Sequence, residues 1–337
     1  NEDTIGDLLL AWHADFCTHQ PHQSTPLFVD GVLYVTTAWS KLYAFDARTG
    51  ETLWQYDPKV PGEWNVNVCC GLDNRGAAAW NGKVIFGTLD GRLIALDAGT
   101  GEEVWSIKST PEGRYSITVP PRVVDGRVYI GQAGGEFGVR GYLDAYDADT
   151  GERLWRWWTV PGNPADGFEN EAMEMAAETW KTPGWWENGG GGGPVWDAIV
   201  YDAVNDLVIF GTGNGSPWSA IDRDPGGGDN LFLSSIVALD AVTGEYRWHY
   251  QLNPWEAWDY DANQQLALVD LELDGEMRRV ILQAPKNGFF YVWDAATGKL
   301  LSAEAFTSVN WATGINLDTG RPIEVEGARY DVTEEGW

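Results

Sequence analysis

The sequence predicts an all-β fold, specifically a β-propeller. The first observation is a repeat of the pattern Asp-x-x-Thr-Gly, which occurs at residues 45–54, 96–105, 146–155, 239–248 and 293–302 and in most cases closes on Trp. The second is that each unit alternates short Val, Ile, Leu and Tyr runs with turn residues, as in "GKVIFGTLDGRLIALDAGTGEEVWS" at 82–106. A period near 50 residues with several strands per unit is typical of propeller blades.

Within each unit, the order of strands and turns follows from local chemistry. Residues 82–106 are predicted to form a strand, an Asp-Gly hairpin, a second strand, the Asp-x-x-Thr-Gly turn and a third strand. The closing tryptophans are predicted to pack between neighbouring blades, which accounts for part of the 20 tryptophans in the chain; they are Trp54, Trp105, Trp155 and Trp248. Only "NEAMEMAAETW" at 170–180 favours a helix.

The number of blades follows from the spacing of the Thr-Gly glycines. These glycines stand at 50, 101, 151, 244 and 298, so the intervals are 51, 50, 93 and 54 residues. We interpret the interval of 93 as two periods, with "YDAVNDLVIFGTGN" at 201–214 as a degenerate unit inside it. Partial units at the start and around 316–324 bring the prediction to about six blades or parts of blades. Because the first and last blades of a propeller must meet, we expect one incomplete domain, 1–337, truncated at both ends.

Composition excludes several classes of partner. The 337 residues are 44% hydrophobic and 21% charged, which is typical of a globular protein, and the formal net charge is −28. Nucleic acid and anionic membrane surfaces require a basic face, so neither is expected to bind. No apolar run approaches the ~20 residues of a membrane span. The chain begins at Asn1 without a signal peptide, which indicates a processed protein or a fragment.

Cys69 and Cys70 are adjacent in "WNVNVCCGLDNRG", and the chain has only three cysteines. A bond between them would close a loop of almost no length, so it would remove almost no entropy from the unfolded chain. Their Cα atoms stand about 3.8 Å apart, below the usual ~4.4–6.8 Å of a disulfide. Such a bond would be strained in the way that functional sites are. Two reduced, buried thiols are the alternative.

Three further stretches depart from the repeat. Glu136 stands in the glycine-rich turn "GQAGGEFGVRG", so its carboxylate is expected to point off an exposed rim. Five glycines lead into Trp196, which could form a flat platform, and "GTGNGSPW" places Asn214 in a tight turn. In "WDYDANQ", Asp259 and Asp261 would face the same side of an extended strand and repel one another unless a cation lay between them. A solvated acid, a flexible linker, an ordinary turn Asn and a solvated strand face are the respective alternatives.

Together these side chains form a set of hard oxygen donors. Such a set suits Ca²⁺ or a similar ion and does not suit zinc. The four histidines are not spaced as a pair of metal ligands, and no Gly-x-Ser-x-Gly, phosphate loop, Cys-x-x-Cys-His or dinucleotide fingerprint occurs.

In this order, five motifs resemble the quinoprotein alcohol dehydrogenases, which oxidise methanol or ethanol with pyrroloquinoline quinone (PQQ). The motifs are "CCGLDNRGAAAWNGKVIFGTLDGRLIALDAGTG", "GEFGVRGYLDAYDADTGERLWR", "GGGPVWDAIVYD", "GTGNGSPW" and "WDYDANQQL". The resemblance runs from about Thr25 to the end of the chain. It implies an eight-bladed propeller with W-shaped, four-stranded blades and tryptophan docking motifs, of which this chain would hold about six blades or parts.

The resemblance also implies a role for each site residue. A Cys69–Cys70 disulfide would cover one face of the quinone, and Trp196 would stack on the other. Asp259 would be the catalytic base that takes the alcohol proton as hydride moves to the quinone. The residues implied to hold the metal are Glu136, Asn214, Asp259 and Asp261. The other residues implied to contact the cofactor are Arg75, Thr118, Gly134, Gly135 and Lys286.

Asp261 bears on the identity of the metal. Within the family, an aspartate two residues after the base is typical of lanthanide-dependent members, and a trivalent ion tolerates one more anionic ligand. The sequence therefore leaves Ca²⁺ and a lanthanide open and slightly favours the lanthanide.

The resemblance extends to partners and location. It implies a small alcohol as substrate, a cytochrome c as electron acceptor and a periplasmic location, and it leaves a homodimer open. Two other functions are compatible with the repeats. A non-catalytic periplasmic propeller scaffold would share the repeat but lack the cysteine pair, the glutamate turn and the Asp-x-Asp. A quinoprotein sugar or polyol dehydrogenase would share the blades but usually lack adjacent cysteines.

Overall fold

The computed structural model describes residues 4–16, 18–187 and 190–329. Most of these residues lie in five four-stranded antiparallel sheets, each with its strands adjacent in chain order. The first three sheets comprise β1 (Leu27–Val29), β2 (Val32–Thr36), β3 (Leu42–Asp46), β4 (Thr52–Tyr56); β5 (Ala78–Trp80), β6 (Lys83–Gly87), β7 (Arg92–Asp97), β8 (Glu103–Lys108); and β9 (Arg122–Val124), β10 (Arg127–Ile130), β11 (Tyr142–Asp147), β12 (Arg153–Trp158). The other two comprise β14 (Ile199–Asp202), β15 (Leu207–Gly211), β17 (Ser235–Asp240), β18 (Tyr246–Gln251); and β19 (Ala267–Leu273), β20 (Glu276–Gln283), β21 (Phe289–Asp294), β22 (Leu300–Ala305).

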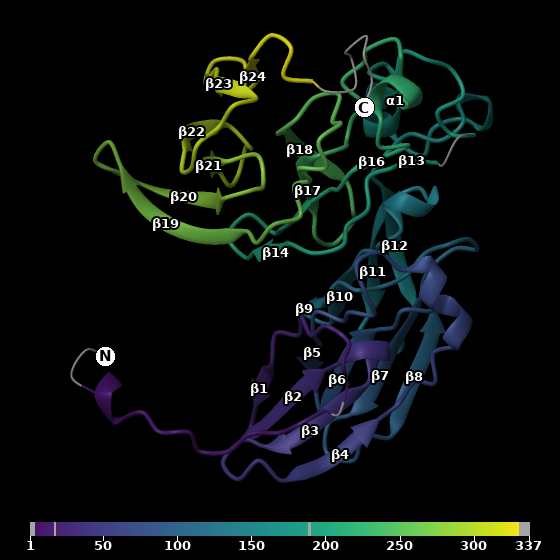
Figure 1. The fold of residues 1–337 in the computed structure, drawn as a ribbon, viewed down its shortest axis with the longest axis vertical. Coiled ribbons are helices and arrows are strands. Elements are labelled where there is room, and N and C mark those ends of the chain that lie inside the picture. Colours follow the sequence, from purple (N-terminus) through teal and green to yellow (C-terminus); the bar gives the residue numbers. More distant parts are fainter. Residues whose placement is uncertain (1–3, 17, 188–189, 330–337) are drawn as a thin grey trace.

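Each sheet is one propeller blade. Figure 1 shows the blades following one another in chain order along an arc. The first strands of successive blades touch one another, β5 with β9, β9 with β14 and β14 with β19, so they form the inner edge of the arc. The predicted propeller is therefore confirmed.

Shorter elements connect the blades. Two two-stranded sheets pair β13 (Gly191–Gly192) with β16 (Gly215–Ser216) and β23 (Ala312–Ile315) with β24 (Pro322–Glu324). The helices are α1 (Glu171–Ala177), α2 (Ala220–Arg223) and the 3₁₀ turns η1 (Ile5–Asp7), η2 (Ala38–Ser40), η3 (Gly62–Asn67), η4 (Gly135–Phe137) and η5 (Pro164–Asp166). The helix predicted within 170–180 is α1, which Asn170 caps by accepting a hydrogen bond from the Met173 N–H at 3.0 Å.

The repeat motif forms the turn between the third and fourth strands of a blade. In the first blade, Asp46 Oδ1 accepts hydrogen bonds from the Thr49 N–H (2.7 Å) and from Thr49 Oγ1 (2.9 Å). The same pair of bonds recurs in the next turn, between Asp97 and Thr100. The aspartate and the threonine three residues later thus form the hydrogen bonds of the turn within the motif itself.

The closing tryptophans do dock on the next blade, as predicted. Trp54 Nε1 donates to the Ala98 carbonyl at 3.0 Å, and its indole covers the Thr-Gly glycine of the second blade. A Cβ on that glycine, Gly101, would lie 2.7 Å from Trp54 Cδ2, and the glycine has φ +75°. Trp105, Trp155 and Trp248 lie in the same way against Gly151, Gly244 and Gly298. The glycine is therefore required both by its backbone and by the indole above it.

One prediction about the repeats is wrong. Residues 201–214 are not a separate degenerate unit, because β14 and β15 pair with β17 and β18 in a single blade. The interval of 93 residues arises from two insertions into and before that blade, at 159–198 and 212–234, which contain the short helices and β13 and β16. The described residues thus contain five full blades and the two-stranded β23–β24, in agreement with about six blades or parts.

A tyrosine takes the place of the docking tryptophan at the unit that contains β23 and β24. Tyr250 OH donates to the Gly320 carbonyl at 2.6 Å, and its ring would meet a Cβ on Gly320 at 2.9 Å. At the other end of the chain, Trp12 Nε1 donates to the Ala47 carbonyl at 2.9 Å and its indole covers Gly50. Among the described residues, no helix is long and apolar enough to cross a membrane.

Candidate functional site

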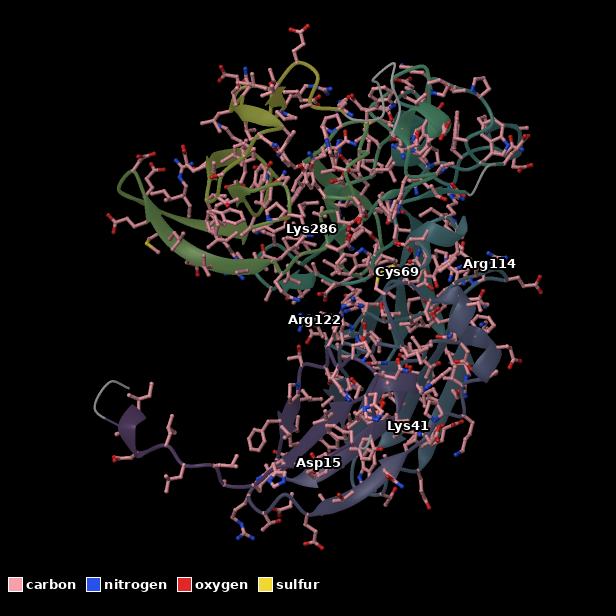
Figure 2. All side chains as sticks on the ribbon, in the orientation of Figure 1. Asp15, Lys41, Cys69, Arg114, Arg122 and Lys286 are labelled. Carbon is pink, nitrogen blue, oxygen red and sulfur yellow. A yellow bond between two sulfur atoms is a disulfide. The ribbon has the colours of Figure 1, made fainter. Side chains whose placement is uncertain are left out.

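A cavity of about 220 Å³ collects side chains from segments that connect the strands of all five four-stranded blades. Its lining residues are Cys69, Cys70, Asp73, Arg75, Thr118, Ala133, Gly134, Glu136, Pro194, Trp196, Trp218, Asp259, Asp261 and Lys286. Figure 2 shows two of them, Cys69 and Lys286, toward the middle of the molecule although more than two hundred residues separate them. Every lining residue except Asp73, Ala133, Pro194 and Trp218 was predicted as a site residue from the sequence.

The two predicted residues that do not line the cavity lie directly beside it. A Cβ on Gly135 would be 2.8 Å from Asn214 Oδ1, so Asn214 packs against the turn that carries Glu136. Asn214 is buried and Nδ2 donates to the Gly215 carbonyl at 3.1 Å. The tight turn predicted for Asn214 is not found, because residues 212–214 form an irregular link from β15 to β16.

Cys69 and Cys70 are joined by a disulfide, with their Cα atoms 3.8 Å apart. The backbone turns sharply at this point, since Cys70 has φ +68° and Gly71 has φ +117°. The structure therefore contains the vicinal disulfide and not the alternative pair of free thiols. Both cysteines line the cavity.

Arg75 is held in place by its backbone and by one side-chain bond. Its N–H donates to the Thr118 carbonyl at 2.9 Å, and its carbonyl accepts from the Thr25 N–H at 2.9 Å. Nη1 donates to Thr118 Oγ1 at 2.7 Å, and the guanidinium carbon lies 5.0 Å from the centre of the Trp196 ring. Burial lowers the pKa of Arg75, while the nearby carboxylates of Asp197 and Asp73 act in the opposite direction.

Asp259 and Asp261 meet at a single ammonium group. The extended strand predicted for them is wrong: both lie in the loop between β18 and β19, with φ of +60° and +55°. Lys286 Nζ is 2.8 Å from Asp261 Oδ2 and 3.6 Å from Asp259 Oδ2. The ammonium of Lys286 thus supplies a cation close to both acids.

Burial controls the ionisation of this cluster. It raises the pKa of Asp261 to about 7 and also raises the pKa of Asp259, in both cases against the attraction of the Lys286 ammonium. Burial alone would lower the pKa of Lys286, but the two carboxylates outweigh it and the pKa is raised.

Glu136 stands on the exposed rim, as predicted. It lies in η4 between Gly134 (φ +120°) and Gly138 (φ +76°), which let the chain reverse around it. Burial of its carboxyl group on the cavity side raises the pKa of Glu136, and the Asp259 carboxylate adds to the shift.

The donor chemistry fits a hard cation only in combination with a ligand. Within the described ranges, no group of three or more His, Cys, Asp or Glu side chains is close enough to hold a metal alone. However, Asp261 Oδ1 and Asn263 Oδ1 are both buried without a hydrogen-bond partner in the described chain. A Cβ on Gly213 would meet both, at 3.0 and 3.2 Å, so the two acceptors border one small space. Buried acceptors of this kind need a donor or a cation.

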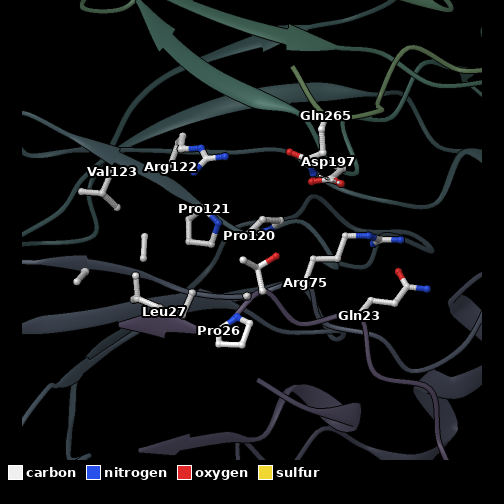
Figure 3. Close-up of a pocket in the computed structure, with 15 residues that line it drawn as sticks. Gln23, Pro26, Leu27, Arg75, Pro120, Pro121, Arg122, Val123, Asp197 and Gln265 are labelled. Atoms are coloured by element: carbon white, nitrogen blue, oxygen red, sulfur yellow. Dashed lines mark hydrogen bonds between the residues drawn. The ribbon is translucent and has the colours of Figure 1, made fainter. Parts of the chain in front are cut away.

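A second cavity shares a wall with the first. It measures about 490 Å³, and Figure 3 shows Arg75, Arg122, Asp197 and Gln265 around it together with Pro26, Pro120 and Pro121. Gln265 Nε2 donates to Asp197 Oδ2 at 3.0 Å, and Arg122 Nε donates to the Ile199 carbonyl at 2.7 Å. Although this cavity is larger and contains Asp197, it lacks the disulfide, the pair Asp259 and Asp261, and Lys286, so the smaller cavity is the candidate site.

The fold is that of a quinoprotein propeller. Residues 1–304 match the PQQ family described as glucose/ethanol/alcohol dehydrogenase, β-propeller domain, and the chain belongs to this family.

Individual relatives agree with the family match. The chain is 52% identical over 328 residues to the quinohemoprotein alcohol dehydrogenase ADH IIB of Pseudomonas putida, a match that covers 97% of this chain and 47% of the relative. The crystal structure of quinohemoprotein alcohol dehydrogenase from Comamonas testosteroni superposes with a TM-score of 0.96 at 49% identity, covering 99% of this chain and 50% of that one. A europium-containing methanol dehydrogenase gives a TM-score of 0.88 at 36% identity, covering 96% and 58%. The chain spans about half the length of the curated relatives it matches.

Sequence reasoning missed two polar or aromatic members of the cavity. Asp73 lies inside the quoted "CCGLDNRG" motif, and Trp218 ends the quoted "GTGNGSPW", so both stood next to predicted residues. The signal that could have found Asp73 is an acid between the cysteine pair and Arg75, in a segment with no repeat pattern.

Proposed function

We propose that the full-length protein oxidises small alcohols to aldehydes with PQQ as cofactor and with Ca²⁺ or a lanthanide ion. The observation that carries the proposal is the convergence of Asp259 with the disulfide, Arg75, Trp196 and Glu136 on one cavity. The names of the relatives support an alcohol as substrate. The cysteine pair, the Glu136 turn and the Asp259–Asp261 loop depart from the repeat, which argues against a purely structural propeller.

The residues present fit the cofactor. PQQ is a planar tricarboxylate, and the cavity offers the guanidinium of Arg75 and the ammonium of Lys286 in a chain that is otherwise strongly acidic. Trp196 and the Cys69–Cys70 sulfur atoms provide apolar surface for a flat ring system. When bound, the quinone supplies a two-electron acceptor and the metal ion supplies Lewis-acid polarisation.

Asp259 would act as the general base. Its carboxyl group lines the cavity and stays 3.6 Å from Lys286 Nζ, so it is reachable and not locked in a short ion pair. It would accept the hydroxyl proton of the alcohol, and Lys286 would stabilise its ionised form beforehand. Glu136, Asn214 and Asp261 would hold the metal ion through carboxylate and amide oxygens.

Location and partners complete the proposal. A vicinal disulfide needs an oxidising compartment, which supports the periplasm. A cytochrome c would take the electrons, a proposal that the "quinohemoprotein" names of the relatives support.

The test uses the full-length protein. Purified apoprotein is supplied with PQQ and either Ca²⁺ or La³⁺, and reduction of an artificial dye is followed with methanol, ethanol and butanol. Dye reduction that requires both PQQ and a metal is the expected result. No reduction with either metal across these alcohols would refute the proposed activity, and reduction with a sugar but no alcohol would replace the substrate class.

A further inference from the structure

Asp73 is a buried acid in the wall of the candidate site that the proposed reaction does not use. It is 2% exposed and lies in the segment between the disulfide and Arg75. Neither Oδ1 nor Oδ2 has a hydrogen-bond partner among the residues that the structure describes. An ionised carboxylate left without donors is among the costliest groups to bury, so its position calls for an explanation.

Few cations compensate for this acid. Arg75, two residues along the same segment, is the nearer one, but its Nη1 is engaged with Thr118 Oγ1. The exposed imidazole of His22 approaches from the segment before β1. Burial raises the pKa of Asp73, and Arg75 and His22 oppose this shift without cancelling it. The other charged groups that line the cavity are Glu136, Asp259, Asp261 and Lys286.

The charge of Asp73 should strongly affect the binding of a polycarboxylate ligand. Such a ligand enters a cavity that already contains the carboxyl groups of Glu136, Asp259 and Asp261. An ionised Asp73 would add one more negative charge close to the ligand and could only accept hydrogen bonds. A neutral Asp73 adds no charge and carries an O–H donor.

From this geometry we propose that Asp73 is a protonation-dependent gate on cofactor binding, which admits the anionic quinone as the neutral acid and weakens its binding when ionised. The inference rests on the proposed function, because it names PQQ as the ligand. It predicts that cofactor binding takes up or retains one proton at Asp73. Binding should therefore weaken as the pH rises through the titration of this group, by up to about tenfold per pH unit.

The test compares Asp73→Asn with the wild type in the full-length apoprotein. Asn has nearly the same shape, is always neutral and keeps an N–H donor. The dissociation constant of PQQ is measured at fixed Ca²⁺ by equilibrium dialysis from pH 5.5 to 8.5. We expect equal affinities at low pH and, at pH 8.5, at least tenfold tighter binding by Asp73→Asn. One control should follow the wild type: Asp166→Asn, which removes an exposed carboxylate outside the cavity.

Each outcome discriminates. Parallel pH profiles for Asp73→Asn and the wild type would overturn the inference while leaving the proposed function intact. A wild type that binds no PQQ at any pH would overturn both. If Asp73→Asn does not fold, infrared spectra of the PQQ-loaded wild type with isotopically labelled aspartate decide the question. A protonated carboxyl band from a buried aspartate at pH 7 that persists in Asp261→Asn and is lost together with bound PQQ at higher pH supports the inference, and the absence of such a band at pH 7 refutes it.

Discussion

Asp259, Tyr260 and Asp261 show how a short sequence pattern gains meaning from one distant residue. The two acids alone would repel, yet left-handed backbone at both positions brings their carboxylates to Lys286, 25 residues downstream of Asp261. The Lys286 ammonium is closer to the buried Asp261 than to the more accessible Asp259. Asp261 is therefore held in an ion pair, whereas Asp259 is free to react. This difference gives each acid its own prediction.

Asp259→Asn should abolish most turnover without removing the cofactor. Asn cannot accept the alcohol proton as a carboxylate does, so kcat should fall by about 10²–10⁴-fold. PQQ content, measured by absorbance of the protein purified by gel filtration, should stay within about twofold of the wild type, because Arg75, Lys286 and Trp196 are unchanged. Turnover within tenfold of the wild type would exclude Asp259 as the base; Asp166→Asn serves as the control for charge.

Asp261→Ala should change which metal supports activity. Removing this buried carboxylate takes one anionic ligand from a site suited to a trivalent ion, so La³⁺-dependent dye reduction should fall at least tenfold more than Ca²⁺-dependent reduction. Activity is titrated against each metal separately. A variant that keeps its La³⁺-dependent activity would contradict the proposed role of Asp261.

At the scale of the blade, one turn serves two purposes. The Asp-x-x-Thr-Gly segment closes its own sheet through the aspartate and presents a bare glycine to the tryptophan of the preceding blade. Each blade is thereby locked to the next by the same residues that fold it. The repeat is visible in the sequence because both requirements act on the same few positions.

Gly101→Ala should therefore destabilise the propeller. The alanine would have to adopt the left-handed backbone conformation of Gly101, and its Cβ would lie 2.7 Å from the Trp54 indole. The strain and the close contact should lower the free energy of unfolding by about 1–3 kcal/mol. The matched control is Gly99→Ala in the same turn, where the nearest atom, Asp97 Oδ1, is 3.5 Å away. Chemical denaturation measures both, and equal midpoints for the two variants would contradict the docking argument.

β18 carries a histidine that makes the fourth blade sensitive to acid. Burial lowers the pKa of His249 from 6.5 to about 4, and its Nδ1 lies 2.6 Å from Tyr246 OH. Between these two values the unfolded chain binds the proton and the folded chain does not, so stability is lost as the pH falls from about 6.5 to about 4.

His249→Asn should reduce this acid sensitivity, although it lowers stability at neutral pH through lost packing against Phe232. The wild type should lose up to about 3 kcal/mol over this interval from His249 alone, and the variant should lose correspondingly less. Unfolding midpoints at pH 7 and pH 4.5 provide the measurement. A loss of stability in the variant as large as in the wild type would assign the sensitivity to other groups.

At the scale of the whole molecule, the candidate site exists only because the five blades are packed together. Its residues run from Cys69 to Lys286 and lie in connecting segments, while the strands provide the scaffold. Contacts between blades fix their relative positions; Asp202 on β14, for instance, accepts a hydrogen bond from Arg279 Nε on β20 at 2.5 Å. A ligand that binds in this cavity would therefore bind only the folded, assembled propeller.

PQQ and Ca²⁺ together should raise the thermal unfolding midpoint of the full-length apoprotein. A ligand that binds only the folded state adds about 2.7 kcal/mol at a free concentration one hundred times its dissociation constant. Differential scanning calorimetry measures the shift, and a chelator should reverse the part that depends on the metal. An unchanged midpoint at saturating PQQ would show that the cavity does not bind the cofactor.

The sequence by itself determined the propeller, the docking tryptophans, the helix at 170–180 and most of the cavity residues. It could do so because the same strand, turn and docking residues recur in each unit. The site motifs are also visible, because each is contiguous and interrupts that repeat. It could not determine that residues 201–214 belong to the blade completed by β17 and β18, since strand pairing across an insertion leaves no local trace. Nor could it place Asp259 and Asp261, because a left-handed loop and an extended strand are compatible with the same letters.

Only the tertiary structure decided which side chains balance one another. The fold brings Lys286 close to two acids and Asn214 against Gly135, although these residues are far apart in the sequence. It also leaves the buried carboxyl group of Asp73 without a hydrogen-bond partner among the described residues. Burial and charge depend on those neighbours, so the pKa shifts that distinguish Asp73, Asp259 and Asp261 arise only when the blades close around the cavity.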